Sequence, residues 1–108
     1  MSVTEVTDAT FEAEVRRAAG PVLVDYWADW CLPCKQMTPI IHELARHYGD
    51  RLKFCSVDTN ANTVIPVRQG VMALPTIQIF RHGELVSSLQ GGKTKGALVK
   101  AIEAALEG

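Results

Sequence analysis

Short apolar runs alternate along the chain with segments whose apolar residues recur at helical spacing. The runs "VLVDYWA", "RLKFCSVDT" and "ALPTIQIF" are mostly apolar rather than alternating, which is typical of central strands covered on both faces. A tight turn at His82-Gly83 is predicted to join the last of these runs to a further strand, "ELVSSLQ". Another short strand is expected near Val3 to Val6. These runs are the predicted strands of one sheet.

The segments between the strands predict helices. In "TDATFEAEVRRAAGP", Thr7 or Asp8 is expected to cap a helix that buries Phe11 and Val15. A long helix should begin at the cysteines that follow "VDYWAD", and a short helix is expected within "NANTVIPVRQG". An amphipathic helix is predicted from about Thr94. This alternation indicates an α/β domain whose helices cover both faces of the sheet.

Composition and charge narrow the class of protein. The chain has 108 residues, 47% hydrophobic and 21% charged, with a formal net charge of -1, which fits one globular domain over residues 1–108. This balance does not indicate binding to nucleic acid or to an anionic membrane surface. The amino terminus lacks the pattern of a signal peptide, and no apolar run is long enough to span a bilayer. A cytoplasmic protein is therefore expected, and without a glycine-rich phosphate loop no cofactor is expected.

The segment "VDYWADWCLPCKQM" contains two cysteines three positions apart, and three functions compete for Cys31 and Cys34. A zinc site would need a second ligand pair, and neither Cys55 nor the histidines stand at ligand spacing. A structural disulfide here would close a loop too short to remove much entropy from the unfolded chain. The odd number of cysteines also argues against a disulfide scaffold.

A redox pair explains these residue types best. At the first turn of a helix, Cys31 would lie beside unpaired N–H groups and the positive end of the helix dipole. Both favour the thiolate, which lowers the pKa from its free value of about 8.5. Cys34 would lie close enough to attack a mixed disulfide formed on Cys31.

The sequence "WCLPCK" preceded by "VDYWAD", with "ALPT" and "RHGE" further along, resembles the thioredoxin family. The resemblance runs from about Val3 to the end of the chain without an obvious insertion. A lone CxxC is a weak signal, but tryptophan, CxPC and a distant apolar-Pro-Thr together are specific. The resemblance implies the thioredoxin fold, which is a central mixed β-sheet flanked by helices on both faces.

The resemblance also implies catalytic roles for three residues. By similarity, Cys31 is the exposed nucleophile that attacks a substrate disulfide, and Cys34 lies deeper and resolves the mixed disulfide. Asp25 matches the buried carboxylate of the family. An Asp within an apolar central strand is costly to ionise, so its pKa should be raised. It is expected to act as a base for Cys34, and the alternative is a purely structural carboxylate.

A substrate-binding surface is implied around the cysteines. Pro75 matches the family's cis-proline, and the backbone of Leu74 is expected to pair with an extended substrate segment. Gly91 matches a family glycine at the same surface, although a simple turn residue is an equally good interpretation. The residues expected to bind substrate are Trp30, Leu32, Pro33, Leu74, Pro75 and Gly91, with Ala73 beside them.

Several positions depart from the family pattern. Leu32 stands where glycine is usual, which is expected to alter partner choice and to shift the redox potential. Ser56 stands where a lysine is common, so the pKa of Asp25 should rise further. Asn60, in place of a frequent aspartate, is expected to carry little weight, and Cys55 is expected to be a buried core residue. The three histidines receive no role.

The predicted function is reduction of disulfides in protein substrates by the Cys31/Cys34 pair of a monomer. The resemblance implies that an NADPH-dependent thioredoxin reductase recycles this pair. One alternative is an oxidant or isomerase with the same fold. The best-known proteins of that kind carry histidine between the cysteines, and the lack of an export signal also argues against it. The other alternative is a non-catalytic module that binds a partner through the same surface.

Overall fold

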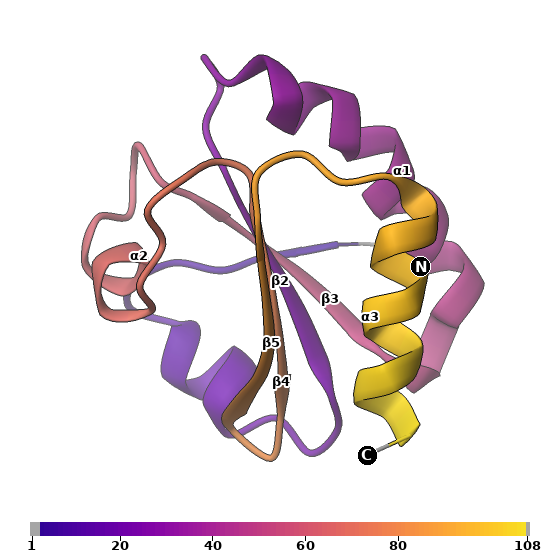
Figure 1. Ribbon diagram of the computed structural model, residues 1–108. Helices are drawn as coiled ribbons and strands as arrows, with labels where there is room; N and C mark the ends of the chain where they lie inside the picture. Colours follow the sequence, from indigo (N-terminus) through magenta and orange to yellow (C-terminus); the bar gives the residue numbers. More distant parts are fainter. Residues whose placement is uncertain (1–2, 108) are drawn as a thin grey trace.

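A computed structural model describes residues 3–107 and contains one five-stranded sheet with the strand order β1-β3-β2-β4-β5 (Figure 1). The strands are β1 (Thr4–Glu5), β2 (Val22–Trp27), β3 (Lys53–Asp58), β4 (Thr76–Arg81) and β5 (Glu84–Gln90). The helices are η1 (Glu12–Arg16), α1 (Leu32–Tyr48), η2 (Gly49–Arg51), α2 (Val64–Arg68) and α3 (Lys95–Glu107).

The sheet is mixed, as the resemblance implies. Strands β1, β3 and β2 run parallel, whereas β4 is antiparallel to β2 and β5 is antiparallel to β4. Strand β2 lies at the centre, where its register places Asp25 between Ser56 of β3 and Ile77 of β4. The polar residue within the predicted central strand therefore has a sheet neighbour on both sides.

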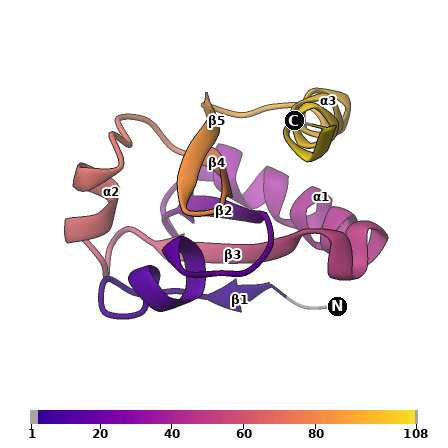
Figure 2. The same ribbon diagram turned by 90° about the horizontal axis from the view of Figure 1, so that it is seen from below.

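Helices cover both faces of the sheet. Alternation along β2 directs Leu23 toward α1 and α3, and Val22 and Val24 toward the opposite face with η1 and α2. Figure 1 shows α1 and α3 on one side of the sheet and α2 on the other, and Figure 2 shows the same layers from below. Because Asp25 is two positions after Leu23, it faces the α1 layer.

The predicted hairpin turn is present between β4 and β5. His82 and Gly83 both have positive φ angles, of 52° and 78°, which is the backbone of a type I′ turn. A Cβ atom on Gly83 would lie 2.7 Å from the carbonyl oxygen of Arg16. Glycine is thus required there both by its φ angle and by the close approach of η1.

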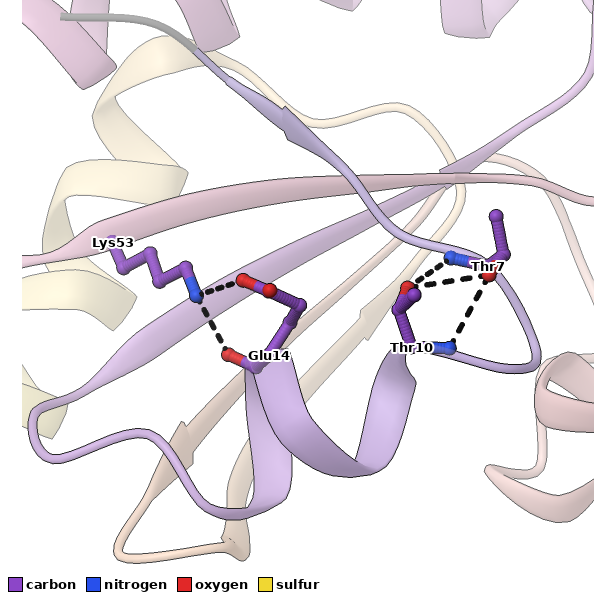
Figure 3. A network of polar contacts seen from close by, with 4 residues as sticks. All are labelled: Thr7, Thr10, Glu14 and Lys53. Atoms are coloured by element: carbon purple, nitrogen blue, oxygen red, sulfur yellow. Dashed lines mark hydrogen bonds and ion pairs between the residues drawn. The ribbon is translucent and has the colours of Figure 1, made fainter.

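The first helix is shorter than its apolar pattern indicates. It is a single π-type turn that buries Phe11 and Val15, and the Arg17 N–H donates to the Glu12 carbonyl oxygen at 2.9 Å. Thr7, one of the two predicted caps, accepts a hydrogen bond from the Thr10 N–H through its side-chain oxygen (Figure 3). The same view shows the Glu14 carboxylate paired with Lys53 of β3, which fixes η1 against the sheet.

Asp8, the other predicted cap, serves a different helix. Its carboxylate accepts hydrogen bonds from the N–H groups of Val64 at 3.2 Å and Ile65 at 2.8 Å. Asp8 therefore caps the start of α2, which is distant from it in the sequence. This contact holds the α2 segment against the amino-terminal loop.

Candidate redox site

The two cysteines of the motif lie at the amino end of α1 and form a disulfide. Cys31 is the N-cap residue of this 17-residue helix, and its Sγ accepts a hydrogen bond from the Cys34 N–H at 3.2 Å. Pro33 occupies the first turn, where its missing N–H leaves no helical hydrogen bond unmade. The sulfur of Cys31 thus faces the positive end of the helix, as the sequence predicts.

The two cysteines are equally shielded from solvent. Each retains 4% of its accessible surface, so the expectation that Cys34 lies deeper than Cys31 is wrong for this disulfide form. Both pack with Ala28, and with Trp27 and Leu74 at the edge of the cluster. The two cysteines therefore share one packing environment.

Asp25 is a buried carboxyl group without a salt-bridge partner among residues 3–107. Asp25 is buried, with 7% of its surface exposed, and its Oδ1 has no hydrogen-bond partner among these residues. Burial raises the pKa of Asp25 to about 7 from an ordinary value of 3.8. The upward direction is the one expected from the sequence, and the neighbouring Ser56 supplies no charge to oppose it.

A pocket of about 360 Å³ lies beside Asp25 on the α1 face of the sheet. Its walls come from β2, β3, the start of the chain and one side of α1. The lining residues are Val3, Asp25, Trp27, Thr38, Ile41, His42 and Ser56. His42, which sequence reasoning left without a role, therefore shares a pocket with the candidate base. The only signal in the sequence was its helical spacing from Thr38.

An apolar surface surrounds the cysteine pair. Trp30 is 70% exposed and Leu32 is 65% exposed, which is unusual for large hydrophobic side chains. A second pocket, of about 260 Å³, lies beside Trp30 and is bounded by the segment that leads into β4. Its lining residues are Trp30, Thr59, Pro66, Val71, Met72, Ala73 and Leu74. The structure thus brings Trp30 and Leu74 to one surface.

Trp30 is held in place by Asn60, a contact that the sequence analysis missed. The Trp30 Nε1–H donates to Asn60 Oδ1 at 3.1 Å, and the Asn60 amide donates to Asp29 Oδ1 at 2.9 Å. The backbone of Asn60 is fixed in turn by Asp58, whose Oδ1 accepts from its N–H at 2.9 Å. Asn60 therefore positions the exposed indole.

The remaining predicted binding residues meet at the start of β4. The Leu74–Pro75 peptide bond is cis, and Pro75 is buried. The Gly91 N–H donates to the Pro75 carbonyl oxygen at 2.7 Å, and Gly91 has a positive φ angle of 86°. The next residue, Gly92, lies beside Pro33, because a Cβ added to it would be 3.7 Å from the Pro33 Cβ. Gly91 is therefore adjacent to the site as well as being a turn residue.

Cys55 lies away from the redox pair. It is fully buried in the cluster on the opposite face of the sheet, together with Val24 and Val57, as expected for a core residue. Burial raises the pKa of its thiol to about 11. Such a thiol is a poor nucleophile at neutral pH.

No group of three or more His, Cys, Asp or Glu side chains within residues 3–107 is arranged to hold a metal ion. No helix of the described chain combines the length and the apolar character needed to cross a bilayer.

The geometry defines a class of protein: a thiol–disulfide oxidoreductase with a Cys-X-X-Cys pair at a helix start, on a mixed sheet with helices on both faces. The Thioredoxin family model matches residues 2–104. The chain is 41% identical to "Thioredoxin" of Pseudomonas aeruginosa over 102 residues, covering 94% of each chain. It is 39% identical to "Thioredoxin 1" of Synechococcus elongatus over 98 residues, covering 91% of this chain and 92% of that one.

A third relative, "Thioredoxin M2, chloroplastic" of Arabidopsis thaliana, is 39% identical over 98 residues, which are 91% of this chain and 53% of the relative. These matches span nearly the whole chain. The chain belongs to the thioredoxin family, and its function is that of a disulfide oxidoreductase with Cys31 and Cys34 as its cysteine pair.

Proposed function

We propose that this chain reduces disulfides in protein substrates, with Cys31 as the attacking thiolate and Cys34 as the resolving thiol. The observation that carries the proposal is the place of Cys31 at the N-cap of α1, where the Cys34 N–H donates to its sulfur. A hydrogen bond and the positive end of a helix both stabilise negative charge on sulfur. The thiolate is the species that attacks a disulfide.

The proposed reaction has two steps. The Cys31 thiolate attacks one sulfur of the substrate disulfide, forms a mixed disulfide and expels the other sulfur as a thiolate. Cys34 then loses its proton and attacks the Cys31 sulfur, which closes the Cys31–Cys34 disulfide and expels the second substrate thiolate. Two electrons pass from the protein dithiol to the substrate, whose two thiolates take up protons from solvent.

Asp25 is proposed to be the base that accepts the Cys34 proton. A base works best when its pKa lies near the working pH, and burial raises the pKa of Asp25 to about 7. The carboxyl faces the α1 layer, which also carries Cys34, and its Oδ1 has no partner within residues 3–107. It is therefore able to take up a proton without breaking a hydrogen bond of that oxygen.

Substrate is proposed to bind over the apolar surface beside the disulfide. The exposed side chains of Trp30 and Leu32 supply apolar contact, and Pro33 and Gly91 border the same surface. Leu74 and Pro75 contribute the edge of the segment that leads into β4. Among residues 3–107, no backbone hydrogen bond engages Leu74. Its N–H and C=O are therefore suited to pair with an extended substrate strand.

The wider setting is also a proposal. The chain is proposed to be a single domain over residues 1–108 and to act as a monomer in the cytoplasm. An NADPH-dependent thioredoxin reductase would return its disulfide to the dithiol form. Membership of the thioredoxin family supports a reductase partner and protein substrates in general.

Trapping of the mixed disulfide tests the two cysteine roles. The Cys34→Ser variant should accumulate a covalent complex with a disulfide-containing protein such as insulin, because the resolving thiol is missing. The Cys31→Ser variant should form none, and Cys55→Ser is the matched control that should turn over like the wild type. Complexes that form through Cys34 in the Cys31→Ser variant would reverse the assignment.

A further inference from the structure

Asp25 needs a route for its proton, and its surroundings restrict where that route runs. The strand neighbours of Asp25 are Ser56 and Ile77, neither of which titrates in the physiological range. A buried base that takes up a proton in one catalytic cycle must release it before the next. The pocket of about 360 Å³ beside Asp25 is the space through which it can do so. Since one water molecule occupies about 30 Å³ of the liquid, several fit into it.

The wall formed by α1 connects this pocket to the resolving cysteine. Thr38 and His42 are one helical turn apart and both line the pocket. The Thr38 hydroxyl donates a hydrogen bond to the Cys34 carbonyl oxygen at 3.2 Å. One continuous stretch of helix thus carries the thiol that loses the proton, a hydroxyl and an imidazole.

His42 lies where the pocket meets solvent, as does Thr38, and of these two exposed lining residues it is the one with an ionisable ring. Its side chain is exposed, whereas Asp25 is buried, so the two titratable groups of the lining stand at its outer and inner sides. An imidazole ring accepts a proton at one nitrogen while it donates from the other. Histidine is also the side chain whose charge ordinarily changes between pH 5 and 8.

We propose that His42 is the group through which Asp25 exchanges its proton with solvent. This inference rests on the proposed role of Asp25 as the base for Cys34. The Cys34 thiol gives its proton to the Asp25 carboxylate, and the carboxyl passes it through water in the pocket to one ring nitrogen of His42. The imidazolium then releases a proton from its other nitrogen to solvent, which restores neutral His42 and ionised Asp25. In each cycle Asp25 gains one proton from Cys34 and loses one to His42, and the thiol–disulfide exchange itself is unchanged.

Other charged groups near the pocket lie outside its lining. Glu5 of β1 is opposite Ser56 in the sheet, and Lys35 precedes Thr38 by three positions on α1. Glu43, next to His42, pairs with Lys95 of α3. Arg46 and His47 lie further along α1 and are also outside the lining. Within the pocket lining, Asp25 and His42 are the two residues with acidic or basic side chains.

The test compares two matched histidine variants over a range of pH. His42→Asn removes the imidazole from the pocket, and His82→Asn removes one from the distant hairpin turn, where asparagine tolerates the positive φ angle. The measured quantity is the rate of substrate release in a single turnover of the reduced protein with insulin, from about pH 6 to about pH 9. His42→Asn should slow release about threefold to tenfold near neutral pH, and His82→Asn should match the wild type.

Rescue by added imidazole separates a proton relay from a structural effect. Imidazole in the buffer should restore most of the rate of His42→Asn, because a small base replaces the missing ring, and should leave the wild type unchanged. A rate of His42→Asn equal to that of His82→Asn would overturn the relay. Slow release that imidazole does not restore, with a pH profile parallel to the wild type, would also overturn it.

An Asp25→Asn variant distinguishes failure of the relay from failure of the base. If Asp25→Asn is slow and insensitive to imidazole while His42→Asn behaves like the wild type, Asp25 remains the base and only the relay is wrong. If Asp25→Asn retains the wild-type rate and pH profile, the proposed base is wrong, and the relay fails with it.

Discussion

A single side chain, Asp25, is expected to make the stability of this protein depend on pH. The unfolded chain releases the Asp25 proton near the ordinary pKa of 3.8, whereas the folded chain holds it until about pH 7. Between these values the folded state binds more protons, so the free energy of unfolding falls as the pH rises. The loss should begin near pH 4, reach on the order of 4 kcal/mol, and end above about pH 7.

Urea unfolding of the oxidised protein at several pH values measures this loss. Asp25→Asn should be more stable than the wild type by roughly 2 kcal/mol at pH 8, because the cost of burying a charge is removed while an amide must still be accommodated. The same variant should lose most of the slope between pH 4 and pH 7. Equal slopes for the variant and the wild type would show that the slope comes from other groups.

The residues around Asp25 show which features of a site a single residue can predict from the sequence and which it cannot. An aspartate inside the apolar run "VLVDYWA" was sufficient to predict a buried carboxyl with a raised pKa, because burial is the cause of the shift. The helical spacing of His42 from Thr38 does not by itself place His42 in the pocket of Asp25, since that position depends on how α1 packs across the sheet. Asn60 was missed for the same reason, because its contact with Trp30 joins two loops.

At the scale of elements, strand and helix signals were reliable where burial alone decides the pattern. The runs that become β2, β3 and β4 are covered on both faces, so their apolar character is continuous. The helix caps were harder to predict. Thr7 and Asp8 are both suitable cap residues, and only the packing of α2 beside the amino-terminal loop shows that Asp8 caps α2.

The turn between β4 and β5 provides a test at this scale. Gly83→Ala should destabilise the protein by roughly 1 to 3 kcal/mol, because the added Cβ would meet the Arg16 carbonyl oxygen at 2.7 Å and the φ angle is 78°. The matched control is Gly96→Ala in α3, where no atom lies within 4 Å of the added Cβ. That change should stabilise the helix by up to about 1 kcal/mol.

Thermal or denaturant unfolding of both variants measures the difference. Gly83→Ala and Gly96→Ala both remove one glycine from the unfolded ensemble, so the unfolded-state effect is common to the pair. A Gly83→Ala variant as stable as Gly96→Ala would mean that the hairpin shifts away from η1 at little cost.

At the scale of the whole molecule, the redox surface is assembled from segments that are far apart in the sequence. Trp30, Leu74 and Gly91 come from three different loops, and the sheet topology brings them together at one end of the fold. Periodicity cannot show such a surface. The resemblance to the thioredoxin family anticipated it, but not the equal burial of the two cysteines, which depends on the disulfide that joins them.

The equilibrium reduction potential is the property of the whole molecule that best separates a reductant from an oxidant. Strong oxidants stabilise their reduced form, which requires strong stabilisation of the thiolate. Here Cys31 Sγ accepts from the Cys34 N–H at 3.2 Å, and the residues between the cysteines, Leu32 and Pro33, carry no charge. Because no charged side chain between the cysteines adds to this stabilisation, a reductant is favoured and a potential of about -270 mV is expected.

Tryptophan fluorescence against a series of glutathione or reference-thioredoxin mixtures measures this potential. Trp27 packs against the cysteine cluster and should report its redox state. The Cys34→Ser variant, which cannot form the disulfide, is the control for changes in fluorescence unrelated to it. A potential between roughly -180 and -120 mV would instead assign the chain to oxidants or isomerases. The Leu32→Gly variant would then show whether the leucine between the cysteines causes the shift, because it restores the residue that is usual in the family.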